Sequence, residues 1–259
     1  MKSEEDSNPI VRPSIFWLLA EGGRAISELG LSIPYRKFFT SKGKGDGHPV
    51  LVLPGFMASD LSTKPLRKFI NDLGYTAYGW DLGKNTAKTV FLDLLLEKID
   101  SIYEQHGEKV SLIGWSLGGI FARQLAKARP DIIRQVITMG SPFKGIDKAN
   151  NVAWVYNLIS GGKRVRDIDP ILFNDIPFPA PVPTTAVYTK GDGIVPWQLC
   201  MEEEDDIHQN IQVYGSHLGL GVNLSVLRII EDRLFYREEN WTHFRSKGLI
   251  KDLLYAPSL

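Results

Sequence analysis

Residues 110–120 read VSLIGWSLGGI, and this stretch decides the fold. Its first half is apolar, as in a buried strand, and residues 117–128 have the spacing of an amphipathic helix. Ser116 lies where the strand would turn into the helix, with Gly114 two positions before it and Gly118 two positions after it. Such a turn strains the backbone at its apex, and flanking glycines prevent a clash between the two elements. We therefore expect the Ser116 hydroxyl to stand clear of the sheet at its carboxyl edge, where open α/β sheets bind ligands.

Short β-rich runs alternate with helical segments along most of the chain. The sequence predicts strands at 49–54, 76–80, 109–114, 134–139, 184–189 and 210–214, and helices at 66–73, 86–106, 117–128 and 224–236. This alternation predicts an α/β fold with a mostly parallel central sheet and helices on both faces. Strands that are apolar throughout fit burial on both sides. We expect residues 48–143 and 182–259 to form this core.

Two regions interrupt the alternation. Residues 1–47 form a partly helical lead-in, which we expect to pack on the core. Residues 144–181 separate two consecutive strands, and so long a connection is usually functional, so we expect a small cap or lid above the sheet. The candidate substrate-binding side chains are Trp115, Met57, Trp154 and Phe173. The alternative is that the apolar side chains of the insertion pack the cap onto the domain, and that Trp115 fills the core.

The composition excludes several classes of protein. Thirty lysines and arginines balance thirty aspartates and glutamates, which argues against a nucleic-acid-binding protein with a basic face. The single cysteine, Cys200, excludes an intrachain disulfide and a multi-cysteine zinc site. The first residues are acidic and polar, unlike a secretory signal, and the apolar run at 15–20 is far shorter than the ~20 residues of a membrane span. We expect a soluble, cytoplasmic protein without a metal site.

One part of the lead-in has two interpretations. Residues 14–39 combine aromatic and basic side chains: Trp17, Phe38, Phe39, Arg24, Arg36 and Lys37. Such a segment could make peripheral contact with a membrane surface. More often a segment of this kind packs against its own domain, and this is the interpretation that we favour.

The pattern G-x-S-x-G between a strand and a helix is typical of a nucleophilic serine. A serine hydroxyl needs a base to take its proton, and histidine is the usual one. Of the five histidines, only His217 follows a predicted strand and so shares the sheet edge of Ser116. His48 and His208 precede strands, His106 ends a helix, and His243 lies in the carboxyl-terminal tail. His217 is therefore the predicted base, because the base must lie within reach of the nucleophile.

The predicted base needs a carboxylate that fixes its tautomer. Asp192 follows a strand and lies in a glycine turn, GDG, so it belongs to the same edge. Other candidates are Asp167, Asp169 and Asp175 in the insertion, whereas Asp205 and Asp206 belong to an acidic run, EEEDD, expected to be a solvated face. We favour Asp192, which gives the chain order Ser116, Asp192, His217.

Negative charge on a substrate carbonyl oxygen needs preset N–H donors. One predicted donor is the N–H of Leu117, directly after the serine. The other belongs to the loop after the strand at 49–54, where Gly55 lets the backbone come close. Phe56 is the favoured second donor and Met57 the alternative.

These residues resemble the α/β-hydrolase superfamily, and in particular its bacterial lipase-like and esterase-like members. VLPGF resembles the oxyanion segment of that superfamily. TMGSPFKG resembles the segment that follows the next strand after the nucleophilic serine, here the predicted strand at 134–139. DGIVPW and GSHLGLG resemble the acid and histidine loops. The resemblance implies the α/β-hydrolase fold, with eight strands or a trimmed version of them. It also implies hydrolysis of an ester or a related acyl bond without a cofactor.

Taken together, these patterns predict a serine hydrolase of carboxylic esters, lipase-like or carboxylesterase-like, that forms an acyl-serine intermediate. The predicted substrate is a small-molecule acyl ester with an apolar part. One alternative is an acyltransferase or a thioesterase that uses the same three residues. Another is a ligand-binding protein on the same scaffold that catalyses no reaction, since fold does not fix function.

Overall fold

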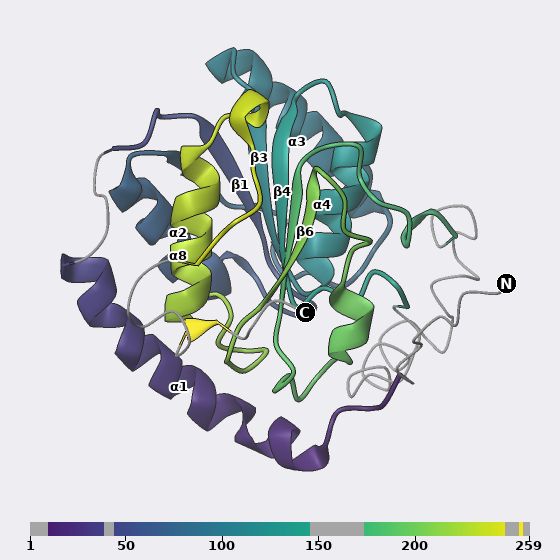
Figure 1. Ribbon diagram of the computed structural model, residues 1–259. Coiled ribbons are helices and arrows are strands. Elements are labelled where there is room, and N and C mark those ends of the chain that lie inside the picture. Colours follow the sequence, from purple (N-terminus) through teal and green to yellow (C-terminus); the bar gives the residue numbers. More distant parts are fainter. Residues whose placement is uncertain (1–9, 39–43, 146–173, 247–253, 256–259) are drawn as a thin grey trace, which may run out of the picture.

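A twisted parallel sheet forms the centre of the computed structural model, which describes residues 10–38, 44–145, 174–246 and 254–255 (Figure 1). Its strands are β1 (Pro49–Leu53), β2 (Thr76–Tyr78), β3 (Val110–Trp115), β4 (Ile133–Met139), β5 (Thr184–Tyr188) and β6 (His208–Gln212). Within the described residues the sheet has six strands in the order β2-β1-β3-β4-β5-β6, and each neighbouring pair is parallel. The predicted mostly parallel sheet is therefore confirmed. The last strand begins at His208, two residues before the predicted start.

Helices cover both faces of the sheet, as predicted (Figure 1). The helices α2 (Asp60–Leu73) and α8 (Leu224–Phe235) lie on one face, and α3 (Val90–His106) and α4 (Leu117–Ala128) lie on the other. Alternation along β1 shows why both faces need cover. Val50 and Val52 belong to the hydrophobic cluster under α2 and α8, whereas Leu51 and Leu53 belong to the cluster under α3 and α4. The interior strands β1, β3 and β4 supply apolar side chains to both clusters, as expected for strands buried on both faces, whereas the edge strand β6 (HQNIQ) is largely polar.

The helix α4 has the bounds that the sequence predicts, and two other helices differ from expectation. The helix α2 begins at Asp60, six residues before the predicted start, and Pro65 lies inside it. Its apolar side chains before residue 66 are too few to give a helical period, so the sequence shows only its second half. The helix α3 begins at Val90 rather than at residue 86, because residues 85–88 belong to a loop that supports the site described below.

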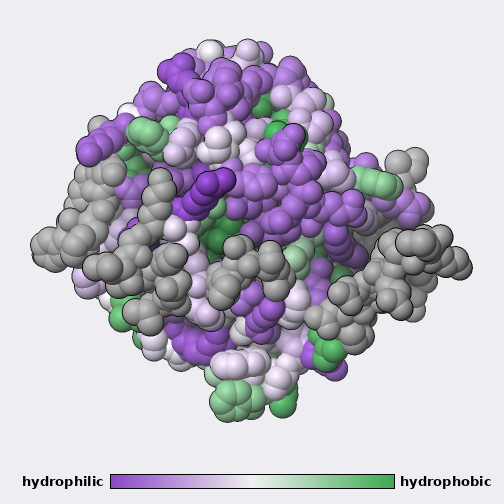
Figure 2. Space-filling view, in the orientation of Figure 1, coloured by the Kyte–Doolittle hydropathy of each residue, from purple (hydrophilic) through white to green (hydrophobic). Residues whose placement is uncertain are grey.

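The amino-terminal helix α1 (Ile15–Phe38) packs against α8 with an unusual orientation. Its buried side chains include Glu21 and Ser32, whereas Leu19 and Ile26 are 80% and 74% exposed. Figure 2 shows hydrophobic side chains along the lower edge of this face, where α1 runs in Figure 1. The helix α1 therefore packs on the domain through polar contacts around Glu21 and, near its end, through Tyr35, which belongs to the hydrophobic cluster under α2 and α8. Within the described residues, no helix is both long enough and apolar enough to cross a membrane.

The turn from β3 into α4 depends on close packing of backbone against backbone. Ser116 has φ 54° and ψ −122°, a conformation that costs an L-residue energy. A β-carbon on Gly114 would overlap the backbone of Gly118 and Gly119, and one on Gly118 would overlap the carbonyl of Leu53. The glycines therefore supply space between the strand and the helix. Gly119 adds a third such position, because it lies directly against the Ser141 side chain.

A second Ser–His–Asp cluster lies at the opposite, amino edge of the sheet. His48 Nδ1 lies 2.5 Å from Asp46 Oδ1, and His48 Nε2 lies 2.9 Å from Ser111 Oγ. Arg134 forms an ion pair with Asp46 at 3.1 Å. His48 is 1% exposed and Ser111 is fully buried, so this cluster joins the start of β1 to the start of β3 and is closed to a substrate. Burial, together with the positive charge of Arg134, lowers the pKa of His48 to about 4 even though Asp46 opposes the shift.

We expect Gly114→Ala to lower the free energy of unfolding by about 3 kcal/mol, because the added methyl group meets backbone that cannot move without unwinding the start of α4. The matched control is Gly22→Ala on the exposed face of α1, where no heavy atom lies within 4 Å of the added carbon. The control should leave stability unchanged or raise it by up to about 1 kcal/mol. Urea titrations of both variants measure the difference, and equal effects would contradict this account of the turn.

The low pKa of His48 predicts a loss of stability in mild acid. Between its ordinary pKa of 6.5 and about 4, the unfolded chain binds a proton that the folded protein does not, so the free energy of unfolding falls as pH falls through this window. Between about pH 7 and about pH 4.5 the wild type should lose about 2 kcal/mol more than a His48→Gln variant. Urea titrations at both pH values test this, and parallel losses in the two proteins would refute it.

Candidate active site

Three predicted site residues lie at the carboxyl edge of the sheet, each directly after a strand. Ser116 follows β3, Asp192 lies in the loop after β5, and His217 lies in the loop after β6. Because the strands are parallel, these loops meet over one edge. Ser116 stays tied to the sheet, since its N–H donates to the carbonyl of Met139 at 2.8 Å.

The structure joins Asp192 to His217 by a short hydrogen bond. Asp192 Oδ2 lies 2.6 Å from His217 Nδ1, and both side chains are almost fully buried. The other carboxylate oxygen, Oδ1, accepts the N–H groups of Ile194 at 2.7 Å and Val195 at 2.8 Å. The carboxylate is therefore fixed by its own loop. A bond at Nδ1 selects the tautomer with the proton on that nitrogen and leaves the Nε2 lone pair for proton transfer.

The electrostatic surroundings favour a protonated imidazole. Burial alone lowers the pKa of His217, but the negative charge and hydrogen bond of Asp192, with a further contribution from Glu21, outweigh burial. The net result is a pKa raised above the ordinary value. The site can thus stabilise the imidazolium that forms when a histidine takes a proton from a serine.

Trp115 and Gly140, at the carboxyl ends of β3 and β4, lie against the loop that carries His217. The indole N–H of Trp115 donates to the carbonyl of His217 at 3.0 Å, and its ring packs against the cluster under α8. Of the two roles predicted for Trp115, these contacts fit core packing and support of the loop. Gly140, directly after β4, has φ 58°, and a β-carbon there would lie 3.0 Å from His217 Nδ1. A glycine is therefore required beside the imidazole.

The loop after β1 lies directly against Ser116. A β-carbon on Gly55 would be 3.2 Å from Ser116 Cβ, so the backbone around Phe56 passes close to the serine. Leu117 is the first residue of α4, and its N–H therefore has no acceptor within the helix. The N–H of Met57 donates to the carbonyl of Asn85 at 2.8 Å. This bond argues against the prediction that Met57 could be the oxyanion donor, because its N–H is already engaged.

Sequence reasoning missed Asn85, which supports this loop. Asn85 is fully buried, and its side-chain amide donates to the carbonyl of Pro54 at 2.8 Å. Its backbone also bonds to both Met57 and Ala58. The sequence around it, GKNT, gives only a turn signal, so nothing in it pointed to a contact 31 residues away.

Three charged residues of α1 also reach the acid and histidine loops, and sequence reasoning missed their role. Glu21, Arg24 and Glu28 each bond to one or both of these loops. The available signal was their spacing of three and four residues, which places them on one face of a helix.

The other histidines lie away from Ser116. His106 bonds to Tyr78, and His208 bonds to Asp205 and to the carbonyl of Ala180. The predicted solvated acidic run is wrong at its first residue, because Glu202 is buried in an ion pair with Arg123. Of the predicted cap and its side chains, Trp154, Phe173 and residues 146–173 lie outside the described residues.

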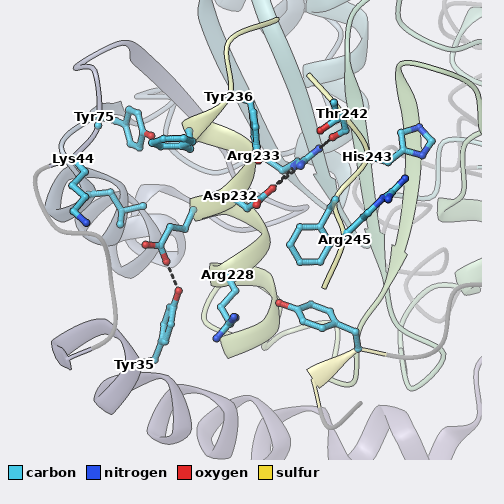
Figure 3. A pocket seen from close by; sticks show the side chains of 16 residues that line it. Tyr35, Lys44, Tyr75, Arg228, Asp232, Arg233, Tyr236, Thr242, His243 and Arg245 are labelled. Carbon is cyan, nitrogen blue, oxygen red and sulfur yellow. Dashed lines mark hydrogen bonds and ion pairs between the residues drawn. The ribbon is translucent and has the colours of Figure 1, made fainter. Parts of the chain in front are cut away.

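A cavity of about 820 Å³ lies elsewhere, between α8, the end of α1 and the carboxyl-terminal segment (Figure 3). Three of the charged side chains in its wall are paired, since Arg233 bonds to Asp232 and Glu231 accepts from Tyr35. Gly45 and Tyr75 place it at the amino edge of the sheet, away from Ser116. Within the described residues, no group of three or more His, Cys, Asp or Glu side chains is arranged to hold a metal ion.

Solved structures with the same fold are lipases and esterases. Lipase B of Aspergillus fumigatus has 17% identity and a TM-score of 0.57 over 78% of this chain, which spans only 55% of that enzyme. A monoacylglycerol lipase of Paleococcus ferrophilus has 20% identity and a TM-score of 0.53 over 76% of this chain and 96% of its own. Est1E of Butyrivibrio proteoclasticus, solved with ferulic acid, has 16% identity and a TM-score of 0.52 over 72% of this chain and 86% of its own. These likenesses confirm the predicted α/β-hydrolase fold.

A family model described as palmitoyl protein thioesterase matches residues 49–187. The match begins with β1 and ends in β5, so it contains Gly55, Phe56 and the turn at Ser116 but stops before Asp192 and His217. Because it covers more than half of the chain, this α/β-hydrolase belongs to the palmitoyl protein thioesterase family.

Proposed function

We propose that the protein hydrolyses acyl esters or thioesters, with Ser116 as nucleophile, His217 as base and Asp192 as the orienting acid. The observation that carries this proposal is the buried bond of 2.6 Å between Asp192 and His217, at the sheet edge where Ser116 is held in a strained turn. Strain and a buried charged pair are both costly, and a site that performs acyl transfer uses both.

The reaction would proceed in two halves. Ser116 Oγ attacks the acyl carbonyl carbon while His217 Nε2 takes the hydroxyl proton. The N–H groups of Leu117 and Phe56 would stabilise the oxyanion. Collapse breaks the bond to the leaving group, which receives the proton from His217, and leaves an acyl-serine. A water then loses its proton to His217 and attacks the acyl carbon, and collapse releases the acid and returns the proton to Ser116.

Carboxylic esters are the substrate class that the sequence resemblance favours, and thioesters are the class in the name of the matched family. The two differ in the leaving group. A thiolate leaves more readily than an alkoxide because thiols are much stronger acids, with a pKa near ~8.5. Loss of the proton donor His217 should therefore impair ester cleavage more than thioester cleavage. An acyltransferase would use the same three residues and would differ in producing a new ester or thioester when an alcohol or thiol is supplied.

One prediction compares two serines: Ser116, directly after β3, and Ser111, a buried residue of β3 that is hydrogen-bonded to His48. Ser116→Ala should lower kcat/KM by about three orders of magnitude or more on p-nitrophenyl esters of increasing acyl length and on matched thioesters. Ser111→Ala, in the closed cluster around His48, should remain within a few-fold of the wild type while folded. A fluorophosphonate probe should label the wild type and Ser111→Ala but not Ser116→Ala.

Equal turnover by the wild type and Ser116→Ala would end the serine-hydrolase proposal. If the folded wild type formed no adduct at Ser116, a ligand-binding protein without catalysis would be the better interpretation.

A further prediction concerns the pH dependence of activity. His217 acts as a base only when neutral, so kcat/KM should rise with pH through the pKa of His217, which lies above its ordinary value. Asp192→Asn removes the charge that raises this pKa, so the acidic limb of the profile should move to lower pH. Maximal activity should also fall by about three to four orders of magnitude, because the tautomer is no longer fixed. A limb that stays in place or moves to higher pH would rule out Asp192 as the partner.

A further inference from the structure

Helix α1 faces the sheet edge with charged side chains and faces solvent with apolar ones. Glu21 is 2% exposed, whereas Leu19, two residues away, is 80% exposed. Burial of apolar surface therefore does not hold this part of the helix in place. Glu21, Arg24 and Glu28 share the inward face, and their contacts explain its position.

Glu21 bridges the acid loop and the histidine loop with one carboxylate. Its Oε1 accepts the N–H of Gly193 at 2.9 Å and the N–H of His217 at 3.1 Å. Its Oε2 accepts the N–H of Leu218 at 2.8 Å. One buried side chain thus fixes the residue after Asp192 and the backbone of His217 relative to each other.

Arg24 and Glu28 extend the same connection. Arg24 donates to the carbonyl of Gly191 at 2.7 Å and also to that of Gly215, so it too joins both loops. Glu28 accepts the N–H and the hydroxyl of Ser216, each at 2.7 Å, and the side-chain amide of Asn223 at 2.7 Å. Charged hydrogen bonds of this kind are stronger than neutral ones, and each fixes a backbone position.

The space around three glycines of the two loops shows how closely α1 packs against these loops. A β-carbon on Gly193 would meet the backbone of Trp17 and Leu18, and one on Gly191 would lie 2.8 Å from Arg24 Nη2. On Gly215 it would lie 2.9 Å from Glu28 Oε2. None of these three glycines has a positive φ, so what each provides is space: for the backbone of α1 at Gly193, and for the ends of the Arg24 and Glu28 side chains at Gly191 and Gly215.

We propose that Glu21 is a positioning residue of the active site, through which α1 sets the placement of Asp192 and His217. This proposal rests on the proposed function of those two residues. Glu21 acts through the loops and touches neither the substrate nor Ser116.

The charged groups that face His217 come from two elements. Asp192 contributes from the acid loop, and Glu21 and Arg24 contribute from α1, where Arg24 lies 4.0 Å from Glu21. Trp115 and Gly140, which pack against the loop from the other strands, are neutral. Glu21 adds a second buried negative charge that favours the imidazolium, in the same direction as Asp192.

The test compares Glu21→Gln with Glu28→Gln, which makes the same chemical change on the same helix face. An amide accepts hydrogen bonds through one oxygen only, so each variant loses part of its support of the histidine loop. Glu21→Gln should lower kcat by about 10- to 100-fold with little change in KM, because the imidazole is misplaced. Its acidic limb of kcat/KM should move to lower pH. Glu28→Gln should leave the acidic limb where the wild type has it.

Two results would overturn the proposal. One is a folded Glu21→Gln protein whose kcat lies within about threefold of the wild type and whose acidic limb is unmoved. The other is an equal displacement of the limb in both variants, which would indicate general loosening of the loop. If Glu21→Gln does not fold, Glu21→Asp keeps the charge on a shorter side chain. It should then lower kcat about tenfold or more without moving the limb, and a wild-type kcat would refute positioning.

The same measurements separate this proposal from the proposed function. Fluorophosphonate labelling of Ser116 in the wild type tests the enzyme itself. If the wild type is labelled and active while Glu21→Gln matches it in kcat and pH profile, only the role of Glu21 fails. If the wild type is neither labelled nor active, the proposed function fails first.

Discussion

The rest of the structure depends on one buried hydrogen bond, between Asp192 Oδ2 and His217 Nδ1. A carboxylate removed from water is costly unless both of its oxygens find donors, and an unpaired buried charge costs several kcal/mol. Asp192 meets this requirement with two N–H groups of its own loop and the imidazole of the next. The bond therefore holds only if two loops, after β5 and β6, keep a fixed separation. The contacts that Trp115 and α1 make with these loops help to keep that separation fixed.

A Ser–His–Asp cluster lies at the amino edge of the sheet and the proposed site of Ser116, Asp192 and His217 lies at the carboxyl edge, and their comparison shows what hydrogen bonds alone do not decide. His48 bonds to Asp46 and Ser111 as closely as a catalytic base would, yet it lies where strands begin, fully enclosed. Arg134 and burial lower the pKa of His48 to about 4, whereas two acids raise that of His217. The amino edge also lacks the turn into a helix amino terminus that Ser116 has, among the described residues. Strain and N–H donors therefore identify the site better than the three residue types do.

Local patterns were enough to predict what is local. The apolar runs located the strands of the sheet, the glycines around Ser116 located the turn, and the amphipathic spacing gave the bounds of α4, because each depends on neighbours within a few residues. His217 could be placed because parallel strands bring their carboxyl ends together. The contacts of Glu21 with Gly193 and His217, and of Asn85 with Pro54, span 31 residues or more and leave no periodic signal. Glu202 illustrates the same limit, since its partner Arg123 is far away in the chain and the acidic run suggested solvent.

The glycines of the acid and histidine loops have a structural role that the sequence does not reveal. In GDG and GSHLGLG, glycine predicts a turn, and turns are present in both segments. In the folded chain, however, Gly191, Gly193 and Gly215 lie so close to α1 that a β-carbon would displace α1 backbone at Gly193 and hydrogen-bonded α1 side chains at the other two, and none of the three has a positive φ. Loops made flexible by glycine would hold a base poorly. Here, however, the absence of side chains at these glycines lets α1 come close enough for its carboxylates and its guanidinium to bond to the loop backbone. The same residues that would make the loops flexible therefore allow α1 to fix them.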